Sequence, residues 1–205
     1  MRNWFASCKY PFRLCILPNG QIDTDSFLLA CDEFVQILDL IGKYNIFYPI
    51  KSRYRYDCEL IMTNHMQTKQ IYTLEQLIAN ERQTFTRNCS HESCLHACRG
   101  LRFLNKAFIF LDEAFNNFFK NNSLELRECF RTVYPYTLGK LHMEITKKLF
   151  MAAMGAVPDN RIFIPMLQGS DTYEQTLKDA LDYFKTYGIV RKRVEEICIR
   201  NKIDH

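Results

Sequence analysis

The densest group of potential metal ligands lies in Cys89-Ser-His-Glu-Ser-Cys94-Leu-His-Ala-Cys98, where five Cys and His residues occur within ten positions. Cys94 and Cys98 are four residues apart and could present two thiolates on one helix face. A structural zinc ion needs four ligands, and the sequence offers no second Cys-x-x-Cys or His-x-x-x-His half to complete the set. We therefore expect no bound metal.

The motifs of common catalytic sites are missing. The sequence contains no Gly-x-Ser-x-Gly elbow, P-loop, Gly-x-Gly-x-x-Gly fingerprint or His-Glu-x-x-His motif. With nine Cys and five His, a Cys/His pair can always be drawn, so such a pair indicates nothing. We expect a protein that is not an enzyme and uses no cofactor.

Charge and apolar runs limit the partners and the compartment. The 205 residues carry 27 Lys and Arg against 23 Asp and Glu, a net charge of +4 that is small for a dedicated nucleic-acid binder. The longest unbroken apolar run, residues 149–157, is far shorter than the roughly 20 residues of a membrane-spanning helix. The first 20 residues lack the apolar core of a secretory signal, and an odd number of cysteines favours reduced thiols. We expect a cytoplasmic protein that does not bind nucleic acid.

The elements that must position any site are helices. Apolar residues recur at steps of three and four, and no segment alternates in the way of a strand. Asp23 or Thr24 caps the first expected helix, Gly42 ends it, and Thr73 to Gln76 forms a capping box for the third. The fold class is therefore all-α, in one domain. The expected helices span about 23–41, 52–66, 73–87, 91–120, 133–156, 159–167 and 171–203.

Three ordered motifs then resemble one family. Ile22-Asp23 precedes Phe-Leu-Leu-Ala-Cys, and Pro49-Ile50-Lys51 leads into the second helix. Arg99-Gly100-Leu101-Arg102-Phe103 lies within the long helix, and His142 stands eight residues before Phe150 in a segment that ends at Pro158. Over roughly 22–203 this order and spacing are similar to those of the glycolipid transfer protein family.

The resemblance implies a two-layer sandwich of about eight helices around an apolar pocket, which takes the chains of one sphingolipid and leaves its headgroup at the surface. It implies a single lipid-transfer domain over 1–205, with 1–21 as an N-terminal extension packed on it, in a monomer that contacts membranes transiently. Shielding a lipid chain from water is worth about 0.8 kcal/mol per methylene. We expect the pocket to be lined by Phe34, Phe47, Phe103, Leu138, Ile145, Phe150 and Met154.

The resemblance also implies a headgroup site made of Arg53, Asp57, His96, Arg99 and His142. Arg53 stands where the family has an Asp that reads the lipid amide, and His96 where it has a sugar-stacking Trp or a phosphate-binding Arg. His142 matches the histidine that donates to the amide carbonyl. Two arginines and a histidine favour an anionic headgroup, such as that of ceramide-1-phosphate. Arg53 and Asp57, four apart on one face, could equally be an exposed ion pair.

Two further points stay open in the sequence. A helical adaptor that senses lipid or binds a protein, without transferring anything, fits the same composition. The family's interfacial Trp is replaced by Glu144, so the membrane contact must come from other residues. The candidates are Lys147, Lys148, Tyr134, Tyr136 and Phe163.

Overall fold

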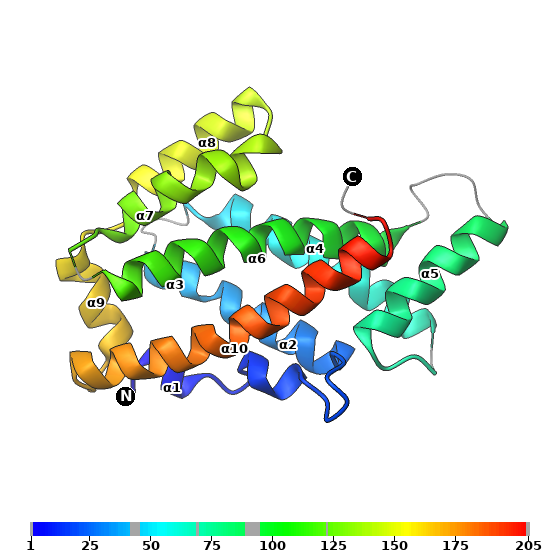
Figure 1. The fold of residues 1–205 in the computed structure, drawn as a ribbon. Helices are drawn as coiled ribbons and strands as arrows, with labels where there is room; N and C mark the ends of the chain where they lie inside the picture. The colour runs from blue at the N-terminus through cyan, green and yellow to red at the C-terminus, as the bar shows by residue number, and fades with distance from the viewer. Residues whose placement is uncertain (1, 42–45, 69, 89–94, 122, 204–205) are drawn as a thin grey trace.

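The computed structural model describes residues 2–41, 46–68, 70–88, 95–121 and 123–203. In these residues the fold is helical, and its β-type contacts are two isolated bridges, Ile16 with Ile22 and Asp23 with Thr73. The all-α prediction is confirmed (Figure 1). The α-helices are α1 (Trp4–Ser7), α2 (Thr24–Val35), α3 (Ile37–Ile41), α4 (Tyr48–Gln67), α5 (Leu74–Asn88), α6 (His96–Lys120), α7 (Leu126–Val133), α8 (Glu144–Gly155), α9 (Asn160–Gln168) and α10 (Tyr173–Arg200), and short 3-10 helices span Phe12–Cys15, Tyr134–Tyr136 and Leu138–Lys140.

Helix α6 lies at the centre of the packing between the long helices. It packs along α4 and α10 and also touches α5 and α7, while α2 packs on α4 (Figure 1). Its buried side chains recur at helical spacing from Ala97 to Phe119, so one long apolar face is covered. Because α4 and α10 share this partner, the position of α6 fixes the spacing of the whole bundle.

An aromatic cluster joins the N-terminal segment to the core. Phe12, Phe34, Phe108 and Tyr187 are each fully buried. The ring centroid of Tyr187 lies 5.0 Å from that of Phe12, 4.8 Å from Phe34 and 5.1 Å from Phe108. These are contact distances for aromatic pairs, so residues before the first long helix are part of the core.

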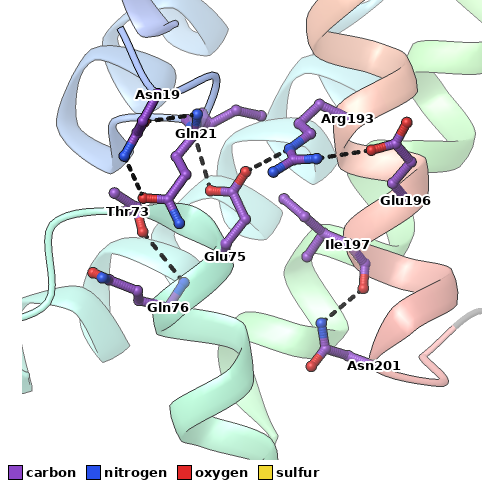
Figure 2. Close-up of polar contacts among 10 residues, drawn as sticks. Asn19, Gln21, Thr73, Glu75, Gln76, Arg193, Glu196, Ile197 and Asn201 are labelled. Carbon is purple, nitrogen blue, oxygen red and sulfur yellow. Dashed lines mark hydrogen bonds and ion pairs between the residues drawn. The ribbon is translucent and has the colours of Figure 1, made fainter. Parts of the chain in front are cut away.

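A buried carboxylate ties three distant segments together (Figure 2). Glu75, in the first turn of α5, accepts a hydrogen bond from the Ile22 amide at 3.1 Å and one from Arg193 Nε of α10 at 2.7 Å. An acid at this end of a helix also interacts favourably with the helix dipole. One turn of α5 therefore anchors both the N-terminal segment and the last helix. As predicted, the Thr73 hydroxyl accepts from the amide of Gln76, at 3.4 Å.

Two helix boundaries differ from the predictions. Helix α4 begins at Tyr48, four residues before its expected start at residue 52, because Pro49 fits the first turn of a helix, where its missing N–H is not needed. The expected helix 23–41 is divided at Gln36 into α2 and α3. Its expected end at Gly42 and the expected residues 91–94 of the long helix lie outside the described residues.

The expected single helix over 133–156 is wrong. It is two short 3-10 helices followed by α8, which begins at Glu144. The backbone leaves helical geometry at Thr137, with φ −109° and ψ −103°, just after Pro135, which has no N–H to donate to an earlier carbonyl. A side chain at Gly139 would bring its Cβ to 2.8 Å from the Tyr134 carbonyl oxygen. The chain turns sharply here, and the periodic apolar residues on both sides hide the turn.

Helices α4 and α6 approach each other closely at Gly100 of α6. A Cβ built on Gly100 would lie 2.3 Å from the backbone oxygen of Asp57 and 3.2 Å from side-chain atoms of Leu60 and Ile61, all on α4. Nothing larger than hydrogen fits between the two backbones. This glycine therefore sets how closely α4 and α6 approach.

We predict that Gly100→Ala lowers the free energy of unfolding by about 1–3 kcal/mol, because α4 must move away from α6. Gly188→Ala, in the interior of α10, is the matched control, since its Cβ would meet the nearest atom, a carboxylate oxygen of Asp112, only at 3.7 Å. The control should be neutral or stabilising by up to about 1 kcal/mol, through helix propensity. Urea unfolding of both variants measures this, and equal effects would contradict the contact.

Candidate functional site

An open cleft of about 520 Å³ lies between α4, α6 and α8. This volume is within the range of sites for small organic ligands. Its walls are mostly aliphatic and aromatic, with polar groups confined to a few positions. The lining residues are Ile46, Pro49, Ile50, Arg53, Tyr54, Asp57, Phe103, Ala107, Leu138, Leu141, His142, Thr146, Leu149, Phe150, Ala152 and Ala153.

A smaller apolar cavity of about 50 Å³ adjoins the cleft. The two share the wall residues Ile50, Tyr54, Ala107, Leu138 and Phe150. The smaller cavity is otherwise bounded by α2, α3 and the core, through residues such as Phe34, Leu38, Phe47, Phe110, Phe130 and Met154. Apolar walls therefore extend from the cleft toward the interior of the helical bundle.

The structure brings most of the residues expected in the pocket to these two cavities. Phe103 lines the cleft, Leu138 and Phe150 line both cavities, and Phe34, Phe47 and Met154 line the smaller one. Ile145 lines neither and is 75% exposed, so its expected place in the pocket is corrected. Helix α8 starts only at Glu144, and its cleft-facing residues are Thr146, Leu149, Phe150, Ala152 and Ala153, which leaves Ile145 on the outer side.

The polar edge of the cleft is built around Arg53 and Asp57, one turn apart on α4. Arg53 Nε donates to Asp57 Oδ2 at 3.0 Å, and Arg53 Nη2 lies 2.9 Å from Asp57 Oδ1. The carboxylate is buried, whereas the Arg53 side chain is 51% exposed. The guanidinium carbon sits 4.2 Å from the centroid of the Phe103 ring, a cation–π distance. The pair is therefore more than a surface ion pair, because one member is buried and both line the cleft.

Arg99, one turn before Phe103 on α6, lies beside this pair. Its Nη2 donates to the hydroxyl of Tyr56 at 3.2 Å, and its charge acts on Asp57. His96, one turn earlier, is the first residue of α6; it is exposed and does not line the cleft. Arg53, Asp57 and Arg99 are thus brought together, but neither Arg99 nor His96 lines the cleft.

His142 faces the cleft from the segment just before α8. Its Nδ1 is joined to the hydroxyl of Tyr134 by a hydrogen bond of 2.9 Å. Tyr134 in turn stacks on Phe150, with ring centroids 4.6 Å apart and planes 9° from parallel. Burial, and then the charge of Lys147, lowers the pKa of His142 below its usual 6.5, so the imidazole is neutral at pH 7. A neutral, held imidazole can donate or accept one hydrogen bond at the cleft wall.

The ionisation of Asp57 is governed mainly by burial. Burial raises the pKa of this carboxyl from 3.8 to about 6, although the nearby Arg53 and Arg99 act in the opposite direction. At pH 7 it is therefore largely ionised, but close to its titration. Among the described residues that line the cleft, Asp57 is the acid, and Arg53 and His142 are the bases.

Sequence reasoning missed two supporting side chains. Tyr56 holds Arg99, and Tyr134, expected at the membrane contact, is buried against His142 and Phe150. Phe163, also expected at the membrane, is fully buried. Tyr56 is three residues beyond Arg53 on one helix face, a spacing that could have indicated it. No local pattern indicates Tyr134, because the turn after it is irregular.

No metal or membrane span is found in the part of the chain that the structure describes. No group of three His, Cys, Asp or Glu side chains there could hold a metal ion, and every described cysteine is a free thiol. Residues 89–94 of the cysteine- and histidine-rich segment lie outside that part. None of the described helices is long and apolar enough to cross a bilayer.

Comparison with known sequences identifies relatives. Residues 22–169 match the family described as Glycolipid transfer protein (GLTP). The chain is 30% identical over 165 residues to a glycolipid transfer protein of Aureobasidium melanogenum, a match that covers 80% of this chain and 78% of that protein. It is 26% identical over 156 residues to human pleckstrin homology domain-containing family A member 8, covering 74% of this chain and 28% of that protein.

Solved structures share the fold. A fungal glycolipid transfer protein superposes with a TM-score of 0.83 at 21% identity, over 95% of this chain and 96% of that one. Human ceramide-1-phosphate transfer protein in complex with 12:0 ceramide-1-phosphate gives a TM-score of 0.85 at 13% identity, over 100% of this chain and 99% of that one. The helices are therefore arranged in the two-layer sandwich of these proteins.

We predict that Asp57 makes the fold less stable as the pH rises from 4 to 6. The folded carboxyl titrates near 6 and the unfolded one near 3.8, so in this window the folded state binds more protons. The free energy of unfolding then falls with rising pH, by up to about 3 kcal/mol from this group, and levels off above 6. Asp57→Asn should remove that slope in urea titrations at successive pH values. Parallel profiles for the two proteins would contradict the prediction.

Proposed function

Because the chain belongs to the glycolipid transfer protein family, we propose that it carries one sphingolipid at a time between membranes, without making or breaking a covalent bond. The observation that carries this proposal is the apolar cleft, which adjoins a second apolar cavity inside the bundle and has Arg53 and Asp57 at one edge. Such a site suits a molecule with hydrocarbon chains and one polar end.

The energetic task of a carrier is to shield the chains. Each methylene exposed to water costs about 0.8 kcal/mol, so ten methylenes cost about 8 kcal/mol, which suppresses free lipid roughly a millionfold. The aliphatic and aromatic walls of the cleft and of the adjoining cavity replace the bilayer as the environment of the chains. No cofactor is needed, since the driving force is burial.

We assign the headgroup to the charged edge of the cleft. Arg53 and Arg99 are donors, Asp57 accepts, and the neutral His142 is placed to bond the amide carbonyl from the opposite wall. The three charges sum to one positive charge, which supports an anionic headgroup such as a phosphate, with neutral glycolipids as weaker ligands. His96, exposed at the start of α6, could contact only a headgroup that extends beyond the cleft.

The surface around the cleft suits transient contact with a bilayer. Tyr48 at the start of α4 is 67% exposed, and Met143 and Ile145 at the start of α8 are 78% and 75% exposed. Lys147 and Lys148 follow on α8, so apolar side chains are flanked by positive charge. We propose that this rim docks on the cytoplasmic face of membranes, and that residues 1–205 act as one monomeric domain.

We predict that the protein transfers sphingolipids between vesicles faster than spontaneous exchange, and ceramide-1-phosphate faster than a neutral hexosylceramide. Arg53→Ala should reduce ceramide-1-phosphate transfer more than hexosylceramide transfer, because the charge-assisted bond to phosphate is lost. Fluorescent lipids in donor and acceptor vesicles measure both rates. No rate above the protein-free control for either lipid would favour a helical adaptor instead.

We predict that Ile145→Asp reduces binding to vesicles at least about tenfold, because an exposed apolar side chain at the docking rim is replaced by a charge. Ile199→Asp is the matched control: Ile199 is 63% exposed near the end of α10, which lies apart from α8 in Figure 1. Vesicle co-sedimentation measures both. Equal losses in the two variants would place docking elsewhere.

A further inference from the structure

The Arg53 guanidinium contacts Asp57 and the rings of Phe103 and Tyr56, and the Tyr56 ring centroid lies 5.6 Å from the guanidinium carbon. One edge, Nε and Nη2, faces the carboxylate of Asp57 at 3.0 and 2.9 Å, and its carbon lies over the Phe103 ring at 4.2 Å. Half of the side chain remains exposed to the cleft. Bidentate recognition of an anion uses two parallel N–H groups of this kind. Asp57 therefore already occupies one anion-binding edge of Arg53.

The position of Asp57 makes its charge unusually influential. The residue is 3% exposed, lines the cleft, and lies in the contact between α4 and Gly100 of α6. Water screens a buried charge poorly, so a headgroup bound at Arg53 would experience it strongly. A unit charge about 6 Å away changes an equilibrium roughly threefold at the dielectric constant of water and roughly a hundredfold at an effective value of 20.

Other charged groups around Asp57 do not duplicate its role. On α4, Arg55 pairs with Asp32 of α2 at 3.1 Å, and Asp32 does not line the cleft. From α6, Arg99 acts on Asp57, and the Arg102 guanidinium carbon lies 5.8 Å from the Phe103 ring centroid. Across the cleft stands His142. Among the residues that the structure describes, those that act on the charge of Asp57 or share its cleft are therefore cationic or neutral.

We propose that the charge on Asp57 sets the headgroup selectivity of the cleft. When Asp57 is ionised, it neutralises Arg53, and neutral and anionic headgroups are bound with only a modest difference. When it is protonated, Arg53 is released as an anion site beside Arg99, and anionic headgroups are strongly favoured. This inference rests on the proposed function, since it concerns the lipid carried in that same cleft.

Proton balance follows from the same geometry. An anionic headgroup on Arg53 repels the carboxylate and competes for the guanidinium, so binding draws a proton from solvent onto Asp57. Because burial already raises the pKa of this carboxyl to about 6, the uptake occurs near neutral pH rather than in strong acid. Selectivity for anionic headgroups should therefore increase as the pH falls.

The test compares two lipids that differ in one group, galactosylceramide and its sulfated form, because a sulfate ester keeps its charge throughout this pH range. Vesicle transfer of each is measured at pH 7.5 and pH 5.5, and the result is the ratio of the sulfated to the unsulfated rate. For the unchanged protein we expect this ratio to rise at least threefold at pH 5.5. Asp57→Asn should show the raised ratio already at pH 7.5 and change less than twofold with pH.

Asp32→Asn is the matched control, since it removes a carboxylate from an Arg–Asp pair of α4 and α2 away from the cleft, and it should behave as the unchanged protein. The inference is overturned if, at pH 7.5, the ratio of the sulfated to the unsulfated rate in Asp57→Asn is equal to or lower than that of the unchanged protein. An equal change of the ratio with pH in the unchanged protein and in Asp57→Asn would also overturn it, and would assign the pH response to His142. If Asp57→Asn does not fold, a flat pH profile of the unchanged protein alone is decisive against it. No transfer of either lipid would instead remove the proposed function, and this inference with it.

Discussion

The contact between α4 and α6 is the constraint on which the site depends. The backbone of α4 passes Gly100 so closely that a Cβ there would lie 2.3 Å from the Asp57 carbonyl oxygen. Arg53 and Asp57 on one helix can meet Phe103 and Arg99 on the other only at this separation, because the cation–π contact spans 4.2 Å. The same approach buries the Asp57 carboxylate and raises its pKa. Packing, ionisation and the charged edge of the cleft are therefore consequences of one close contact.

The described part of the molecule combines a rigid core with an open cleft. Aromatic rings from the N-terminal segment, α2, α6 and α10 fill the interior, and Glu75 connects the segment before α2 to α5 and α10. Helix α8 instead contacts α7 and leaves Leu149 66% exposed over the cleft. Leu149 is exposed because it faces the open cleft rather than the core. A lipid chain placed there would bury apolar surface that the protein alone leaves in water.

Sequence periodicity predicted the long helices, because an amphipathic face repeats over many residues and single exceptions do not erase it. It did not predict α1 or α7, which have only four and eight residues. The ordered motifs around Ile22, Gly100 and His142 also indicated the family and most of the cavity walls. Periodicity failed at 133–143, where the backbone leaves helical geometry at Thr137 while apolar residues continue at helical spacing. For this reason Ile145 was expected inside and lies outside, and the Tyr134–His142 hydrogen bond was not foreseen. Contacts between residues of different helices, such as Arg193 of α10 with Glu75 of α5, leave no pattern in the sequence.

The central claim is that the cleft holds one sphingolipid per chain, and native mass spectrometry tests it most directly. The protein is incubated with vesicles that contain ceramide-1-phosphate and a neutral hexosylceramide, separated from them, and weighed intact. The account predicts a mass increase of one sphingolipid per chain. Ala107→Trp, which fills a position shared by both cavities, should abolish that increase while the protein stays folded. An unloaded chain under these conditions, or a load unaffected by filling the cavities, would contradict the account.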